Sequence, residues 1–222
     1  MSESLIIYKA NDHLEASSCL SNLIINDINK SKNKSFSIGL SGGNTPKITY
    51  SLLRSDIKDL SEIIFWTVDE RWVSKDSDDS NQKLVNSYFS ESDAQILEVE
   101  YSALSAEKDA KNYSDKIKQV ITIFNTVILG VGEDGHIASL FPETEAINNT
   151  EDFYVSNEVD NVTKWRLTAT FTLLKEVKNV YLLVTGNNKK EILTTIMNEG
   201  NTPANKLINE RSETILITDQ EI

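Results

Sequence analysis

The 222-residue chain has little cysteine and few basic residues, and each shortage excludes a class of protein. Cys19 is its only cysteine, so no internal disulfide can form and a reducing compartment is expected. Its 22 Lys and Arg residues are outnumbered by 34 Asp and Glu residues, which gives a net charge of -12. Because nucleic acids and anionic membranes bind basic surfaces, we expect neither as a partner.

Long apolar runs and clustered histidines are also absent. No run approaches a membrane span, and residues 1–8 have no basic residue before their short apolar stretch, unlike a signal peptide. We therefore expect a cytoplasmic protein. The only two histidines, His13 and His136, give no ligand spacing with Cys19, so we expect no metal site. An anionic small molecule is compatible with this composition if a few basic residues converge locally.

Strand, loop and helix patterns alternate along the chain. Apolar runs predict strands at residues 5–8, 36–40, 63–68, 126–131, 153–156, 167–171, 180–185 and 214–218. Periodicity and caps predict helices at 11–30, from 45, at 81–89, 105–120 and 191–197, and from 202. The alternation predicts an α/β fold over residues 1–222, a single-domain three-layer α/β/α sandwich with a mainly parallel, Rossmann-like sheet.

Glycines are concentrated where three of these strands end. Seven of the eight lie there, namely Gly39, Gly42, Gly43, Gly130, Gly132, Gly135 and Gly186. Loops at the carboxyl ends of parallel strands share one edge of the sheet, and open α/β sheets bind their ligands at that edge. We therefore expect a site there.

The first glycine loop, Ser41-Gly42-Gly43-Asn44-Thr45, precedes Pro46 and a predicted helix, with Thr45 as its cap. Its N–H groups, hydroxyls and helix N-terminus suit a phosphate group. A plain strand-to-helix turn is one alternative. Another is the serine hydrolase elbow, since residues 39–43 match G-x-S-x-G. The histidine of that fold normally follows the last strands, whereas several predicted strands follow His136, so the phosphate interpretation is preferred.

The second glycine loop, Gly130-Val131-Gly132-Glu133-Asp134-Gly135, leads to His136. It matches G-x-G-x-x-G formally, but it lies in mid-chain and its two carboxylates would repel a pyrophosphate, so no dinucleotide is expected. Imidazole exchanges protons near neutral pH, which makes His136 the candidate general base for activating water. Asp134 is the candidate to orient it. The alternatives are a structural histidine and an ordinary turn aspartate.

Three basic residues follow or flank predicted strand ends. Asp69-Glu70-Arg71 comes directly after an apolar strand, and Arg166 and Lys189 lie at or beside other strand ends. Each alone is typical of a solvated surface charge. In a chain of net charge -12, however, three basic residues near one sheet edge predict capture of an anion. Arginine favours a phosphate because its donors match the phosphate oxygens in pairs.

Together these segments resemble the glucosamine-6-phosphate isomerase/6-phosphogluconolactonase family, in particular its lactonase branch. The matching segments occur in family order at residues 40–46, 68–73, 80–81, 130–142, 166–168 and 186–189. Arg71 and the Ser-Leu-Phe-Pro ending of residues 139–142 are similar to the lactonases. The deaminase branch typically has tyrosine after Asp-Glu and a Phe-Asn-Glu-Pro ending. One departure is Glu143, which stands where a glycine often follows the proline.

The resemblance implies hydrolysis of 6-phospho-D-glucono-1,5-lactone to 6-phosphogluconate in the oxidative pentose phosphate pathway, without metal or cofactor. It implies that the Ser41 to Thr45 loop, Arg166 and Lys189 hold the phosphate of this phosphorylated sugar lactone. His136 would activate water, and Arg71 would hold the substrate or the developing oxyanion. Asp69 matches the proton-transfer acid of the deaminase branch. A monomer or weak homo-oligomer is expected.

Two other functional classes stay open. A glucosamine-6-phosphate deaminase/isomerase would interconvert an aldose and a ketose and release ammonia, and a tyrosine in place of Arg71 would favour it. A non-catalytic sugar-phosphate-binding domain usually carries a DNA-binding helical module, and no such module is predicted here.

Overall fold

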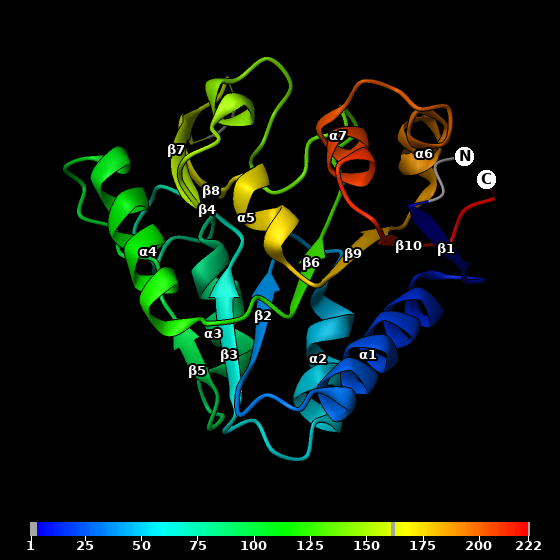
Figure 1. Ribbon diagram of the computed structural model, residues 1–222, viewed down its shortest axis with the longest axis horizontal. Coiled ribbons are helices and arrows are strands. Elements are labelled where there is room, and N and C mark those ends of the chain that lie inside the picture. Colours follow the sequence, from blue (N-terminus) through cyan, green and yellow to red (C-terminus); the bar gives the residue numbers. More distant parts are fainter. Residues whose placement is uncertain (1–3, 161–162, 222) are drawn as a thin grey trace.

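The computed structural model describes residues 4–160 and 163–221, and it contains a central sheet with helices on both faces (Figure 1). The strands are β1 (Leu5–Lys9), β2 (Phe36–Leu40), β3 (Ile63–Thr67), β4 (Asp69–Arg71), β5 (Gln95–Leu97), β6 (Thr126–Leu129), β7 (Tyr154–Glu158), β8 (Trp165–Ala169), β9 (Asn179–Val184) and β10 (Thr214–Thr218). The helices are α1 (His13–Lys30), α2 (Lys47–Asp56), α3 (Asn81–Phe89), α4 (Ala106–Val120), α5 (Phe171–Glu176), α6 (Lys190–Met197) and α7 (Pro203–Asn209), with short 3₁₀ turns at Glu145–Asn148 and Asn187–Lys189. None of the helices in the described ranges is long and apolar enough to cross a bilayer.

The main sheet is parallel throughout, with the strand order β1-β10-β9-β6-β2-β3-β5. The chain moves outward from β2 through β3 to β5 and then returns to β6 on the other side of β2. The strand order therefore reverses between β2 and β6. Sheets of this kind bind ligands beside such a reversal, at the carboxyl ends of the strands. The predicted α/β fold with a mainly parallel sheet is confirmed.

Two apolar layers cover the sheet because side chains alternate along each strand. Ile63 and Phe65 of β3 pack in one layer with residues of α1, α2 and α3. Ile64 and Trp66 of the same strand pack in the opposite layer with residues of α4, α5, α6 and α7. Both faces of a parallel sheet are thus buried, which explains the continuous apolar runs in its sequence.

A second, three-stranded antiparallel sheet has the order β4-β8-β7. Figure 1 shows it at the carboxyl ends of β2 and β3, beside α4. Only Val68 separates β3 from β4, and its N–H donates to Leu40 O of β2 (2.9 Å) while its carbonyl accepts from Ala169 N of β8 (2.8 Å). The small sheet is therefore fixed directly above the place where the strand order reverses.

Several details of the sequence-based prediction are wrong. The short strands β4 and β5 were not predicted, because three residues show no recognisable periodicity. The strand predicted at residues 167–171 ends at Ala169, and Phe171 instead begins α5, which Thr170 caps by accepting Leu173 N–H. Helix α2 begins at Lys47 and has no side-chain cap, so Thr45 does not cap it.

Candidate active site

A cavity of about 330 Å³ opens where the strand order reverses. It brings together loops after β2, β6 and β9 with residues of the small sheet and of the α3 N-terminus. Its lining residues are Ser41, Gly42, Gly43, Thr45, Asp69, Arg71, Asn81, Gly130, Val131, Gly132, His136, Ala138, Ser139, Phe141, Arg166 and Lys189. Of the predicted site residues, two do not line it. Asn44 is exposed to solvent, and Asp134 contacts the ring of His136 without lining the cavity itself.

The Ser41 hydroxyl is a structural group in this arrangement. It is buried and donates to Ile128 O of β6 (2.8 Å), which joins the end of β2 to the neighbouring strand. The Tyr50 hydroxyl in turn donates to Ser41 O (2.6 Å). A serine nucleophile would instead give its proton to a general base, so this geometry argues against the serine hydrolase alternative.

Gly42 is required by the close approach of α3. A Cβ atom at this position would lie 1.8 Å from Oδ1 of Asn81, the first residue of that helix. Asn81 Nδ2 donates to Asp69 O (2.8 Å), so the asparagine lies between the first glycine loop and β4. No role was predicted for Asn81, although Ser80 and Asn81 form one of the segments that resemble the family.

His136 forms a close pair with Asp134. His136 Nδ1 lies 2.6 Å from Asp134 Oδ1, and the same oxygen accepts the His136 backbone N–H (3.1 Å). Because a carboxylate can only accept a hydrogen bond, the neutral form of the ring carries its proton on Nδ1 and its lone pair on Nε2. The ring stacks on Phe141 with centroids 4.1 Å apart, and Gly132 leaves room for it. The imidazole is thereby held in one orientation, with one nitrogen ready to take a proton.

Two arginines meet across the small sheet. In the antiparallel register, Arg71 of β4 lies opposite Arg166 of β8, and Asp69 lies opposite Thr168. Alternation along β4 and β8 places Asp69, Arg71 and Arg166 on the same face, toward the cavity. Burial, followed by repulsion from Arg71, lowers the pKa of the buried Arg166 guanidinium, and the charge of Asp69 raises it. A guanidinium stays protonated at neutral pH, so both arginines carry charge here.

Asp69 is held by a different residue from the one that holds His136. Ser139 Oγ donates to Asp69 Oδ2 (2.7 Å), and Ser139 N donates to Thr168 Oγ1 (3.1 Å). Asn157 Nδ2 of β7 also donates to Ser139 O (2.8 Å). The two aspartates of the predicted site therefore have different partners: Asp134 pairs with His136, and Asp69 pairs with Ser139.

Lys189 completes the basic side of the cavity. Its Nζ donates to Val131 O (2.8 Å), and the neighbouring Asn188 Nδ2 donates to Glu133 Oε1 (2.7 Å). These bonds tie the loop after β9 to the loop that carries His136. Three cationic side chains and one aspartate thus line the same cavity, which suits an anion with more than one negative charge.

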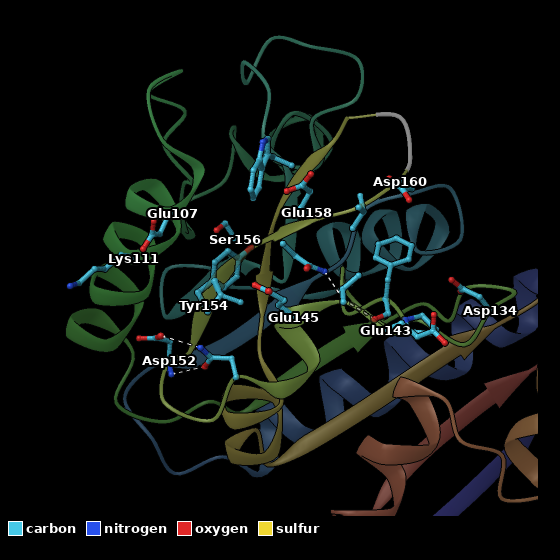
Figure 2. Close-up of a pocket in the computed structure, with 18 residues that line it drawn as sticks. Glu107, Lys111, Asp134, Glu143, Glu145, Asp152, Tyr154, Ser156, Glu158 and Asp160 are labelled. Atoms are coloured by element: carbon cyan, nitrogen blue, oxygen red, sulfur yellow. Dashed lines mark hydrogen bonds between the residues drawn. The ribbon is translucent and has the colours of Figure 1, made fainter.

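A larger cleft of about 1200 Å³ shares Phe141 with this cavity but has the opposite charge. Figure 2 shows acidic side chains around it, and the acids in its lining are Glu107, Asp134, Glu143, Glu145, Asp152, Glu158 and Asp160, against the single basic residue Lys111. These carboxylates would repel an anionic ligand, so we place the candidate site in the smaller cavity. In the described part of the chain, no three His, Cys, Asp or Glu side chains are grouped to hold a metal ion.

The chain is similar to known proteins of one family over most of its length. The model of the family described as glucosamine-6-phosphate isomerases/6-phosphogluconolactonase matches residues 11–216. A protein of Synechocystis named 6-phosphogluconolactonase is 32% identical over 83% of this chain and 82% of its own length. A Dictyostelium discoideum protein named probable 6-phosphogluconolactonase is 32% identical over 85% of this chain and 86% of its own.

Solved structures show the same fold. The crystal structure of 6-phosphogluconolactonase from Thermotoga maritima superposes with a TM-score of 0.86 at 26% identity, over 96% of this chain and 99% of that chain. The 6-phosphogluconolactonase from Trypanosoma cruzi gives a TM-score of 0.88 at 26% identity, over 98% and 95% of the two chains.

Proposed function

The chain belongs to the family of glucosamine-6-phosphate isomerases and 6-phosphogluconolactonases, and on this premise we propose that it is an enzyme that hydrolyses 6-phospho-D-glucono-1,5-lactone to 6-phosphogluconate. The observation that carries the proposal is the placement of an oriented imidazole, His136, in the same cavity as three cations. A lactonase for a phosphorylated sugar needs both a base for water and a clamp for phosphate.

In the first step, Nε2 of His136 takes a proton from a water molecule while the oxygen of that water attacks the lactone carbonyl carbon. The bond between that carbon and the ring oxygen then breaks. The ring oxygen takes the proton from the imidazolium and becomes a hydroxyl, and the new carboxylic acid ionises. Asp134 holds the ring with Nδ1 protonated and stabilises the imidazolium that forms.

Arg71 is proposed to stabilise the oxyanion that develops on the carbonyl oxygen during attack. Its guanidinium is fixed by donation from Nη1 to Asp79 O (2.8 Å) and lies on the cavity wall. A donor already in place where charge develops lowers the barrier without reorganising. Asp69, held by Ser139, is proposed to align the two arginines and to accept a hydrogen bond from a hydroxyl group of the sugar.

The phosphate is proposed to lie against Arg166, Lys189 and the backbone N–H groups of the Ser41 to Thr45 loop. The support is that all three elements line one small cavity in a chain of net charge -12. We further propose that residues 1–222 form one domain of this family, which acts in the cytoplasm as a monomer or weak homo-oligomer. It would need no metal or cofactor and bind neither nucleic acid nor membrane.

The test is a pH-stat assay with freshly made 6-phosphogluconolactone, corrected for spontaneous hydrolysis. The wild-type chain should accelerate acid release, and His136→Ala should reduce the enzymatic rate by roughly 10²- to 10⁴-fold. His13→Ala is the matched control, since the other histidine lies at the start of α1 and hydrogen-bonds to Thr185 (2.9 Å). Ammonia release from glucosamine 6-phosphate, or binding without turnover, would instead support one of the two alternatives.

A further inference from the structure

Glu70 is a buried acid that the proposed chemistry does not use. It lies on β4 between Asp69 and Arg71, which both line the cavity, and only 4% of it is exposed. Because side chains alternate along a strand, its carboxylate points to the opposite side of β4, toward the N-terminus of α3.

Four donors converge on this carboxylate. Oε1 accepts the backbone N–H groups of Arg71 (2.8 Å) and Asn81 (2.7 Å). Oε2 accepts the N–H of Gln82 (2.7 Å) and the hydroxyl of Ser80 (3.0 Å). These hydrogen bonds and the helix N-terminus favour the ionised form of the carboxylate, whereas its burial opposes it. Burial raises the pKa of Glu70 to about 7, against these hydrogen bonds, which lower it.

One of these bonds is not explained by helix capping. Helix α3 already has Ser80 as its N-cap, whose Oγ accepts Lys83 N–H (3.1 Å), and Glu70 accepts the N–H groups of the first two helical residues. The Arg71 N–H lies outside the helix, yet it shares Oε1 with Asn81. The carboxylate therefore joins β4 to α3 at two residues that both reach the cavity, and Asn81 in turn lies against Gly42.

We propose that Glu70 is a positioning residue whose carboxylate fixes Arg71 and Asn81 on the wall of the anion cavity through their backbone N–H groups. Through Arg71 it aligns the proposed oxyanion donor, a part that rests on the proposed function. Through Asn81 it sets the packing of the first glycine loop, which lines the cavity and is proposed to hold the phosphate. Loss of the carboxylate should thus weaken both turnover and anion binding while the fold persists.

The experiment compares Glu70→Ala, which removes all four acceptor contacts, with Glu70→Gln, which retains one acceptor oxygen. Since small misplacements of catalytic groups cost up to about 10²-fold, Glu70→Ala should lower kcat/KM by roughly 10- to 100-fold, and Glu70→Gln should lose less. Asp27→Asn is the control for destabilisation. Asp27 accepts hydrogen bonds from Tyr181 Oη (2.6 Å) and Asn179 Nδ2 (2.9 Å), and Asn179 begins β9, at the edge of the sheet opposite the cavity.

A double-mutant cycle separates positioning from mere stability. When Arg71 is already alanine, Glu70→Ala should lower kcat only a few-fold further, because the guanidinium that it aligns for turnover is gone, whereas its second route, through Asn81, acts on anion binding. If Glu70→Ala lowers kcat by the same factor whether residue 71 is arginine or alanine, the proposal is overturned. It is also overturned if Asp27→Asn, at matched thermal stability, lowers kcat/KM as much as Glu70→Ala does.

Anion binding gives a readout that does not depend on turnover. In calorimetric titrations with inorganic phosphate, Glu70→Ala should bind several-fold more weakly than wild type, and Asp27→Asn should bind as wild type does. If wild type does not hydrolyse the lactone, the proposed function fails, and this titration still decides the role of Glu70. Unchanged phosphate affinity in Glu70→Ala would contradict that role whether or not the lactone is turned over.

Discussion

Replacement of Lys189 by alanine separates two roles that its ammonium group could have. The side chain lines the cavity, is partly exposed, and donates to Val131 O in the loop that leads to His136 (2.8 Å). As a phosphate ligand it would act only on a phosphorylated substrate. As a link between the two loops it would affect the hydrolysis of any substrate, because it would hold the imidazole of His136 in place.

The magnitude follows from a single charge-assisted hydrogen bond. Such a bond is worth roughly 1.5–3 kcal/mol, and the partial exposure of Lys189 favours the lower value because water competes for both partners. An energy of about 1.5 kcal/mol corresponds to about a tenfold change. We therefore expect Lys189→Ala to lower kcat/KM about tenfold on 6-phosphogluconolactone and to leave hydrolysis of unphosphorylated gluconolactone nearly unchanged.

The assay is a comparison of kcat/KM for wild type and mutant on both lactones. Lys190→Ala is the control, because this neighbouring lysine is exposed and does not line the cavity. If Lys189→Ala slows hydrolysis of both lactones by the same factor, the lysine acts through the His136 loop and its assignment to the phosphate is refuted.

Three further predictions concern the other predicted features of the site. Asp134→Asn should lower kcat by roughly 10²-fold or more while changing KM little, since an amide can present N–H to Nδ1 and favour the wrong tautomer; unchanged turnover would remove Asp134 from the mechanism. A fluorophosphonate probe should leave Ser41 unlabelled, because its proton is given to Ile128 O, and stoichiometric labelling with loss of activity would restore the serine esterase alternative. Glu143 has a positive φ of 64°, a backbone conformation that is strained for any residue except glycine. Glu143→Gly should therefore raise the free energy of unfolding by about 0.5–1 kcal/mol in urea denaturation, and a lower value would show that this strain is absent.

Local patterns in the sequence were sufficient for most of the fold. The strand and helix at Phe36–Leu40 and Asn81–Phe89 have the predicted bounds, and Ser105 and Thr202 cap their helices as predicted. These features depend on side-chain periodicity and on hydrogen bonds between residues three positions apart, so a single segment carries the whole signal. The glycine clusters likewise predicted the edge of the sheet at which the cavity lies.

Only the tertiary structure decided which polar groups act together. Arg71 lies opposite Arg166 because β4 pairs with β8, and a three-residue strand carries no local pattern from which that register could be read. The same pairing turns Asp69 toward Ser139 and Glu70 toward the N-terminus of α3, although the two acids are adjacent in the sequence. The sequence determined which residues could do the chemistry, whereas long-range strand pairing determined which of them share a cavity, because contacts between distant segments leave no periodic trace in either segment.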